Sequence, residues 1–454
     1  MKKIIALTAA VAFASSAVAQ NPIIRDQFTA DPTARVFNGR VYVYPSHDIT
    51  PPENARQEWF NMPDYHVFSS HNLVDWIDHG KIVDQATVPW VNSTSYSMWA
   101  PDCIEKDGKY YFYFPAGFDP RLGRGNAIGV AISDTPYGPF VPEPMPIPGV
   151  GGIDPGLFID PADGKAYITW AGGGMRIARL KDNMLELDGE PQTVALPQGG
   201  GLKEGPFMFE RNGKYYYTFP WVINNTTEAL CYSMGDSPMG PFEYKGVIMD
   251  EHENGCWTNH HSLVEFEGQW YLFYHRNDFS PNFDKNRSAR IDKVFFNADG
   301  TIQKVTPTER GVGISDARSE IHLDRYSSLG QGASIEYLNR WTNYFAGWKV
   351  MLPAGSDVTY NDVDFGTGVR KVMARVLAPR GASFSVGTGS GSPAATFSVP
   401  AGNPEWMVVE ATVAATPSGV ENIVVKNTAT PPAPGAGRMA QGPGPVEIDW
   451  IRFY

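Results

Sequence analysis

Four acidic residues stand at similar distances ahead of a recurring turn, which makes them the first candidates for chemistry. They are Asp31, 8 residues before Gly39; Asp102, 6 before Gly108; Asp154, 10 before Gly164; and Glu204, 9 before Gly213. In a fifth copy of the turn, His260 and His261 precede Gly268 by 8 and 7 residues. This shared placement predicts that the side chains surround one axial pocket.

Carboxylates that converge from separate elements are costly to bury together unless a function needs them. Opposed carboxylates beside aromatic side chains suit the hydrolysis of a glycosidic bond. One of them, protonated, gives a proton to the leaving oxygen, and another activates water or attacks the sugar. A third acid near the proton donor raises its pKa by like-charge repulsion. Asp-Pro and Glu-Gly-Pro are also ordinary turn sequences, so the shared offset carries the argument.

The turn itself is an internal repeat. It has the pattern Asn/Asp/Glu-Gly followed by an aromatic run, and its five glycines are separated by 69, 56, 49 and 55 residues. Each copy is typical of a tight turn with a positive-φ glycine that leads into a strand. A second signature, Asp134–Phe140, returns as Asp236–Phe242. Five units of about four strands predict a five-bladed β-propeller over residues 20–315; a β-sandwich with recurrent hairpins is the alternative.

The period ends after Gly311. Residues 319–454 contain alternating stretches such as Lys371–Val376 and Met407–Ala411, and the chain closes with the strand-like run Val446–Tyr454. Alternation of apolar and polar residues predicts half-buried strands. We therefore expect an all-β chain, with the propeller followed by a small, jelly-roll-like β-sandwich.

The first 19 residues have the features of a signal peptide. Lys2 and Lys3 precede the apolar run Ile4–Val18, and Ala17-Val18-Ala19 is a cleavage pattern, so the mature chain is expected to begin at Gln20. Export to the periplasm or beyond follows. No later run reaches the roughly 18 apolar residues of a membrane span, so no membrane partner is expected.

Composition excludes other classes of function. A net charge of −12 without a basic cluster argues against nucleic acid. The common zinc and nucleotide motifs have no match, so no organic cofactor is expected. Three cysteines, Cys103, Cys231 and Cys256, make no disulfide framework. Buried free thiols are favoured over a Cys231–Cys256 bridge, and the protein is expected to be a monomer.

The motifs resemble those of glycoside hydrolase family 43 over about residues 21–312. The matching segments are Asp31-Pro32, Trp99-Ala100-Pro101, Ile153-Asp154-Pro155 and Glu204-Gly205-Pro206. The resemblance implies inverting hydrolysis, with Asp31 as general base, Glu204 as general acid and Asp154 as the residue that orients the acid and raises its pKa. No catalytic role is carried onto Asp102.

The same resemblance implies residues that bind metal and sugar. His260 would contact a structural, axial calcium ion through water, and Arg287 would contact the sugar and the carboxylates. A core histidine is the alternative for His260, as it is for His261, and Arg290 is the alternative to Arg287. Trp99 and Trp257 are expected to bind substrate. Trp90 and Trp221 are further candidate platforms, with a core position as the alternative.

Segments such as Tyr65–Ser70 and Asn72–Trp76 resemble arabinofuranosidases and xylosidases. The implied substrates are arabinoxylan and xylo-oligosaccharides of the plant cell wall, with arabinose against xylose left open. A related five-bladed glycosidase that acts on arabinan, galactan or fructan is an alternative. Among these, a retaining fructosidase is disfavoured, because Ile153 and Gly205 stand where that group carries Arg and Cys. A non-catalytic sugar-binding propeller would not need the acids.

The second domain resembles carbohydrate-binding module family 6 at Val363–Gly366 and Glu447–Phe453. It departs from that family at Ile321–Tyr326, where an Ala-Glu pair is usual, which puts the calcium site of the module in doubt. Trp341, Trp348 and Trp406 are candidate sugar platforms. A sugar binder and a structural brace both remain open.

Overall fold

The computed structural model describes residues 21–224, 226–252, 256–280, 283–339, 346–389, 393–414, 416–430 and 444–454. The predicted signal peptide (residues 1–19), Gln20 and Trp341 lie outside these ranges. Within them the regular elements are β-strands, which confirms the all-β class. No helix in the described part of the chain has the length and apolar character needed to cross a membrane.

Five antiparallel sheets follow one another along the first two thirds of the chain. The first four each have four strands, and the fifth has three among the described residues. The strands are β1 (Phe28–Phe37), β2 (Arg40–Asp48), β3 (Asp64–Ser70), β4 (Ile77–Asp84); β5 (Asp102–Lys106), β6 (Lys109–Gly117), β7 (Asn126–Ser133), β8 (Val141–Pro142); β9 (Ile153–Ile159), β10 (Ala166–Ala171), β11 (Met175–Arg179), β12 (Gln192–Thr193); β13 (Phe207–Arg211), β14 (Lys214–Trp221), β15 (Ala229–Gly235), β16 (Glu243–Met249); and β17 (His261–Phe266), β18 (Gln269–Arg276), β19 (Ser288–Val294).

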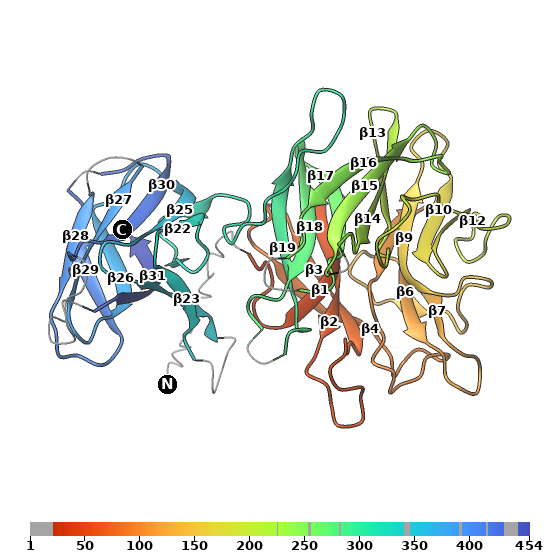
Figure 1. The fold of residues 1–454 in the computed structure, drawn as a ribbon, viewed down its shortest axis with the longest axis horizontal. Coiled ribbons are helices and arrows are strands. Elements are labelled where there is room, and N and C mark those ends of the chain that lie inside the picture. Colours follow the sequence, from red (N-terminus) through yellow and green to blue (C-terminus); the bar gives the residue numbers. More distant parts are fainter. Residues whose placement is uncertain are drawn as a thin grey trace, which may run out of the picture.

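These sheets are the blades of a propeller (Figure 1). The first strands of successive blades, β1, β5, β9, β13 and β17, contact one another in a ring, and β1 also contacts β18 and β19 of the last blade. The backbone amide of Ile23 donates to Ala289 at 2.9 Å, and that of Thr29 donates to Arg287 at 2.9 Å. The N-terminal segment therefore closes the ring, as the predicted five-bladed propeller requires.

The recurring turn has the predicted geometry in four blades. Asn38-Gly39 and its counterparts in the second, fourth and fifth blades have positive φ at both central residues and join strands paired directly across the turn. This is the type I′ hairpin, which matches the twist of the strands. The third blade differs. Ile159 pairs with Ala166, so Asp163-Gly164 lies in a longer loop, held by a 2.8 Å bond from the Gly164 amide to the Asp160 carbonyl.

The second domain is a sandwich of two six-stranded sheets. One contains β20 (Ser315–Asp316), β22 (Ser328–Leu329), β25 (Asp357–Asp364), β27 (Ala382–Thr388), β28 (Ala395–Val399) and β30 (Val420–Asn427). The other contains β21 (Ile321–His322), β23 (Ser334–Tyr337), β24 (Trp348–Leu352), β26 (Lys371–Leu377), β29 (Met407–Thr412) and β31 (Val446–Phe453). Because β20 already pairs with β25, the chain enters the sandwich at Ser315.

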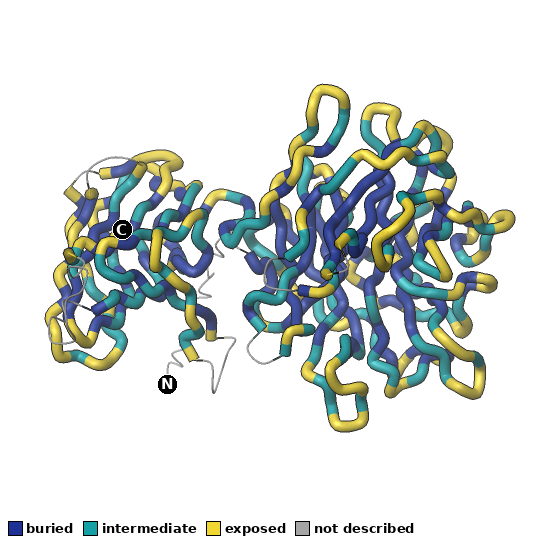
Figure 2. Tube along the Cα trace, in the orientation of Figure 1, coloured by how far each residue is buried: buried dark blue, intermediate teal, exposed yellow. Residues whose placement is uncertain are grey.

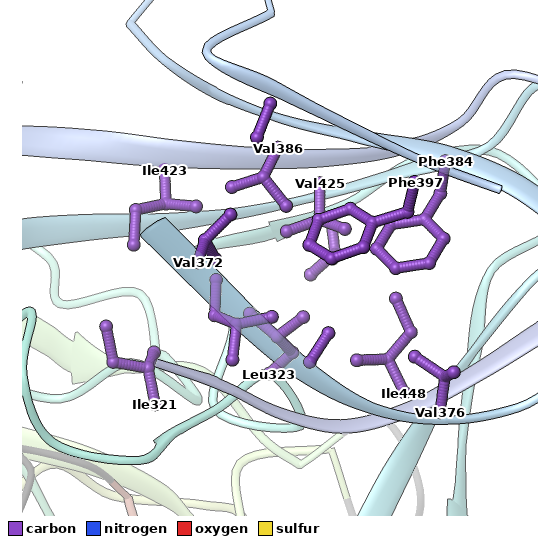
Figure 3. Packing of buried hydrophobic residues seen from close by; sticks show 14 of the residues in the cluster. Ile321, Leu323, Val372, Val376, Phe384, Val386, Phe397, Ile423, Val425 and Ile448 are labelled. Carbon is purple, nitrogen blue, oxygen red and sulfur yellow. The ribbon is translucent and has the colours of Figure 1, made fainter. Parts of the chain in front are cut away.

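The sandwich has its own core between the two sheets. Phe384 and Phe397 stack with ring centroids 4.4 Å apart, next to Val376, Val425 and Ile448 (Figure 3). Across the whole molecule, buried residues lie along the blade strands and between the sheets of the sandwich, while exposed residues gather in the loops (Figure 2). The three cysteines are buried and free, so the predicted thiols are confirmed over the disulfide.

Propeller and sandwich are joined by buried contacts. Trp348 packs on Phe279 with ring centroids 4.1 Å apart, and the Tyr337 hydroxyl donates to the Phe279 carbonyl at 2.7 Å. Arg325 of the sandwich is fully buried, and its Nη1 lies 3.4 Å from the Pro22 carbonyl of the N-terminal segment. Arg310 donates to the Asn361 carbonyl at 2.9 Å. Trp348, a candidate sugar platform, is thus occupied in this interface.

Candidate active site

A cavity of about 260 Å³ lies at the end of the propeller axis. It brings together all the residues predicted to act in catalysis and the predicted contacts Trp99, Trp257, His260 and Arg287. The residues that line it are Asp31, Trp59, Phe60, Met62, Trp99, Ala100, Ile153, Asp154, Leu202, Glu204, Trp257, Thr258, His260 and Arg287. Residues more than 250 positions apart in sequence therefore meet in one pocket.

Asp31 and Asp154 reach the pocket from equivalent irregularities in the innermost strands. The pairing of β1 with β2 shifts between Ala30 and Thr33, and that of β9 with β10 shifts opposite Trp170. Both aspartates have left-handed backbones, with φ of 48° and 58°. Asp tolerates this conformation better than most residues, and the following Pro has no amide to pair. Each Asp-Pro is thus a bulge that turns one carboxyl toward the axis.

Arg287 is 2% exposed and holds Asp31 in place. Its Nη1 lies 3.0 Å from Oδ1 of Asp31, and its Nε and Nη2 each lie 2.9 Å from Asp48. The Ser46 hydroxyl donates to Oδ2 of Asp31 at 2.5 Å. Burial, the largest single effect, raises the pKa of Asp31, but Arg287, His275, His260 and the Ser46 hydroxyl together lower it more, so the pKa is lowered. Asp31 is therefore ionised at neutral pH.

Glu204 has the opposite electrostatic setting. Burial first, and then the nearby Glu228 carboxyl, raise the pKa of Glu204 well above its usual range. Glu228 is 0% exposed and accepts a 2.8 Å bond from the Asn259 amide. Burial raises the pKa of Glu228 to about 8. Two buried carboxyls with little compensating charge favour a proton on one of them.

Asp154 lies between the two other acids. Burial, followed by the charges of Glu204 and Asp31, raises the pKa of Asp154 well above its usual value. Its Oδ2 accepts a 3.1 Å bond from the amide of Gly205, the residue after Glu204. That bond ties the position of Asp154 to the segment that carries Glu204.

His260 packs against the same segment. A Cβ placed on Gly205 would lie 2.8 Å from the Nδ1 atom of His260, and the φ of Gly205 is +51°. Burial lowers the pKa of His260 to about 4, so the ring is neutral at pH 7. Position 205 therefore requires glycine for two reasons: its φ lies in the left-handed region, and a Cβ there would clash with the His260 imidazole.

Residues 19–302 match the sequence profile of Glycosyl hydrolases family 43. The chain belongs to this family. A "Xylosidase/arabinosidase" of Bacteroides ovatus is 36% identical over 324 residues, covering 62% of this chain and 95% of the relative. An "Arabinoxylan arabinofuranohydrolase" of Bacillus subtilis is 28% identical and covers 90% of this chain and 89% of the relative.

Solved structures agree. A family 43 β-xylosidase/α-arabinofuranosidase from a compost metagenome, in complex with xylotriose and in a calcium-free form, is 35% identical with a TM-score of 0.56 and covers 64% of this chain and 98% of its own. An arabinoxylan arabinofuranohydrolase from Bacillus subtilis, in complex with cellotetraose, is 25% identical with a TM-score of 0.54 and covers 97% and 99%. The protein is thus a glycosidase of the arabinofuranosidase/xylosidase type.

Several candidate residues lie elsewhere in the enzyme. Asp102 is 1% exposed; it pairs with Arg35 and accepts a 2.6 Å bond from the Leu157 amide, so it connects three blades. His261 is buried, with its Nε2 atom 2.6 Å from the Thr218 hydroxyl. Arg290 pairs with Asp278 and Glu309 outside the pocket, so Arg287 is the arginine of the site.

Two of the four tryptophan candidates belong to the core. Trp90 is 0% exposed and stacks on Phe114, and Trp221 is 8% exposed beneath the Lys203 ammonium. Trp99 lines the pocket and donates to the Phe60 carbonyl at 3.3 Å, and Trp257 is 43% exposed at its mouth. Trp90 and Trp221 thus differ from Trp99 and Trp257 in the burial of their indole rings within a blade. That burial depends on the neighbouring strands.

Sequence reasoning missed several residues of the site, among them four that shape it. Trp59 and Phe60 come from the loop between β2 and β3, Asp48 anchors Arg287, and Glu228 faces Glu204. None of them keeps a common offset from a repeat glycine. One sequence signal was available, the polar run Ser46–Asp48 at the end of β2, in which Ser46 and Asp48 are buried and His47 is partly exposed.

Proposed function

We propose that the enzyme removes single α-L-arabinofuranosyl or β-D-xylosyl units from arabinoxylan-type hemicellulose, with inversion of the anomeric centre. The observation that carries this proposal is the contrasting setting of two acids in one small pocket: Asp31 contacts Arg287, which favours its ionised form, whereas Glu204 faces Glu228, which favours its protonated form. Acid–base catalysis on glycosides needs such a split. The cavity of about 260 Å³ lies below the roughly 300–1,000 Å³ of pockets for larger ligands, which favours one terminal pentose.

In the proposed reaction, Asp31 accepts a proton from a water molecule as that water attacks the anomeric carbon. Glu204 gives its proton to the departing glycosidic oxygen. Arg287 keeps Asp31 ionised and holds it by a 3.0 Å contact. Asp154 orients the segment of Glu204 through the Gly205 amide, so it acts as a positioning residue.

The substrate is inferred from relatives and pocket together. The relatives are named xylosidase/arabinosidase and arabinoxylan arabinofuranohydrolase. Trp99 and Trp257 offer aromatic faces on which a sugar ring stacks. Arabinofuranose and xylopyranose present similar hydroxyl arrays, so one pocket with these contacts accommodates either.

The test is a substrate panel with a stereochemical readout. Nitrophenyl arabinofuranoside, nitrophenyl xyloside, arabinoxylan and debranched arabinan would be compared by kcat/KM. Proton NMR during the first minutes of hydrolysis would identify the anomer released first. Inverted product from either pentoside, with release of pentose from arabinoxylan, supports the proposal; retained product, or activity on debranched arabinan alone, contradicts it.

We also propose a calcium ion on the propeller axis. The residues fit such an ion, because the pocket carries the three carboxyls of Asp31, Asp154 and Glu204 against one arginine, Arg287. Calcium prefers oxygen ligands. His260 would contact the ion through water, and the ion would supply positive charge near the sugar. Thermal unfolding after chelation and calcium add-back tests this, with His260→Ala expected to abolish the calcium-dependent shift.

Export remains part of the proposal. The N-terminal sequence motif supports cleavage after Ala19, and a cell-wall polysaccharide is reached only outside the cytoplasm. Expression in a bacterial host followed by N-terminal sequencing of the protein outside the cytoplasm tests this. A mature protein that begins at Gln20 supports export, and a protein that keeps Lys2 and Lys3 contradicts it.

A further inference from the structure

Two histidines and an aspartate meet on the first blade, outside the pocket. His47 on β2 faces Asp64 on β3, with its Nδ1 atom 2.8 Å from Oδ1 of Asp64. His66 follows Asp64 by two residues and therefore lies on the same face of the sheet. One ligand atom from each of the three residues lies within 4.8 Å of the other two. The two imidazole rings are 5.6 Å apart.

We propose that His47, Asp64 and His66 bind a first-row transition metal ion of the Zn²⁺ class. Two imidazoles and one carboxylate are a typical protein ligand set for Zn²⁺, with water in the remaining position. Nitrogen ligands select against Ca²⁺ and Mg²⁺, which prefer oxygen. This site is therefore chemically distinct from the axial calcium site.

The surroundings support a metal ion. The Nδ1 atom of His66 lies 3.2 and 3.3 Å from the two carboxylate oxygens of Asp78, so Nε2 is the nitrogen left for a metal. A carboxylate behind a ligating imidazole fixes its orientation and raises its basicity. The side chains of His47, Asp64 and His66 are 24%, 11% and 19% exposed, which shields the site while leaving a path for an ion.

The Lys81 side chain is a cation that could compete with a metal ion for Asp64. The Lys81 ammonium lies 3.8 Å from Oδ2 of Asp64, but it lies closer, at 2.5 Å, to Asp84. It is 47% exposed and so is free to stay with Asp84. Its contact is with Oδ2, whereas Oδ1 of Asp64 faces His47. A metal bound through Oδ1 therefore need not displace Lys81 from Asp84.

The ion would clamp the two ends of the loop that forms a wall of the pocket. His47 precedes Asp48, which holds Arg287, and Asp64 follows the loop that carries Trp59 and Phe60. Metal binding would thus fix loop residues 49–63 at both ends. Stabilisation of the folded state by the ion follows from its preference for the assembled site.

The test is metal titration of the full chain after chelation. Isothermal titration with Zn²⁺, and Co²⁺ absorption in the visible range, should show one site per chain that resists a large excess of Ca²⁺. His47→Gln and His66→Gln should abolish the Co²⁺ spectrum of that site. Asp78→Asn, which removes only the carboxylate behind His66, should weaken affinity about 10–100-fold.

His79→Gln is the matched control, because His79 lies on the same blade but outside the cluster and hydrogen-bonds Ser69. It should leave affinity unchanged. Zn²⁺ should also raise the thermal midpoint of the wild type and of His79→Gln, but not that of His66→Gln. An unchanged Co²⁺ spectrum in folded His47→Gln and His66→Gln, or its loss to excess Ca²⁺, overturns the proposal. None of these readouts depends on the proposed glycosidase reaction.

Discussion

Asp31 and Glu204 face the same cavity with opposite neighbours. Asp31 contacts a guanidinium and a hydroxyl, whereas Glu204 faces another carboxyl in a buried setting. A positive neighbour favours the ionised form and a carboxyl neighbour favours the protonated form. The two acids are therefore distinguished by what surrounds them, and their different roles can be separated by substitution.

Replacing each acid by its amide should give different dependence on the leaving group. Asp31→Asn removes the proposed general base, so all substrates should slow by at least about 10²–10⁴-fold. Glu204→Gln removes the proposed proton donor, and the loss of rate should be smaller for nitrophenyl glycosides, whose leaving group scarcely needs a proton. The measurement is kcat/KM on nitrophenyl and natural substrates. Full nitrophenyl activity in Asp31→Asn, or equal losses on both substrates in Glu204→Gln, would refute these roles.

Glu228→Gln should change the pH profile. Removing a carboxyl that becomes negative near Glu204 lowers the pKa of Glu204, so the proton donor loses its proton at a lower pH. The alkaline limb of kcat/KM should move toward acid by on the order of one pH unit. Glu243→Gln, on an exposed side chain of the same blade, is the control and should leave the limb in place. A limb that stays at the wild-type pH in Glu228→Gln would show that Glu228 has no effect on the donor.

The sequence predicted the acids better than it predicted their neighbours. Asp31, Asp154 and Glu204 share a place in the repeat, so their convergence could be expected from spacing. Glu228 and Asp48 meet them only through the packing of blades, which no single segment encodes. The sequence likewise could not show that Arg287, and not Arg290, lines the pocket, because this depends on how the blades pack around the axis.

At the scale of elements, the pocket depends on strand irregularities and on one crowded glycine. The two Asp-Pro bulges direct carboxyls to the axis, and Gly205 leaves room for His260. Both kinds of feature require unusual backbone angles, which cluster at functional sites. Gly213, in the fourth-blade hairpin, also has a positive φ (+76°) but has open space where a Cβ would be.

Gly205→Ala and Gly213→Ala therefore form a matched pair. Both place a Cβ on a left-handed residue, at a cost of about 1–2 kcal/mol in the free energy of unfolding. Only Gly205→Ala must also displace His260, so only that variant should lose substantial activity. Denaturant unfolding and kcat/KM would be measured for both. Equal activities in the two variants would mean that the position of His260 does not matter for the reaction.

The hairpin pattern predicted the turns of four blades correctly. In the third blade it predicted a tight turn where the structure has a longer loop. In the third blade, Asp160 caps a longer loop through its carbonyl and through a 2.9 Å bond from the Ala162 amide to its side chain. The Asp-Gly pair is the same, so the local motif cannot reveal the added length. In this blade the pairing register of β9 and β10 is set by the two strands and not by the turn residues.

At the scale of the molecule, the sandwich is packed into the propeller and not merely attached to it. Fully buried Arg325 pairs with Asp324, and its Nη1 lies 3.4 Å from the Pro22 carbonyl, beside the ring-closing segment. Burial lowers the pKa of Arg25 in the same region to about 10. A module that only tethered the enzyme to polysaccharide would not need buried charges at this junction.

A chain that ends at Gly313 should consequently lose activity on arabinoxylan and on nitrophenyl glycosides alike, with a lower thermal midpoint. In the full chain, Arg325→Met removes the ion-pair partner of the buried Asp324 and should lower the free energy of unfolding by about 3 kcal/mol. Arg370→Met, on an exposed sandwich residue, is the control. Unchanged nitrophenyl activity in the truncated chain, with loss only on insoluble arabinoxylan, would identify the sandwich as a sugar binder instead.

Ring closure also sets an order in time. The side-chain amide of Asn21 donates to the Ile291 carbonyl across 270 positions, and Asp31 meets Arg287 across 256 positions. At roughly 5–20 residues per second, about 13–50 s of synthesis separate Asp31 from its arginine. During that interval β1 has been synthesised but its partners in the last blade, β17, β18 and β19, have not. The catalytic pocket is therefore among the last parts of the propeller to be assembled, and an unfinished chain has no means of acting on sugar.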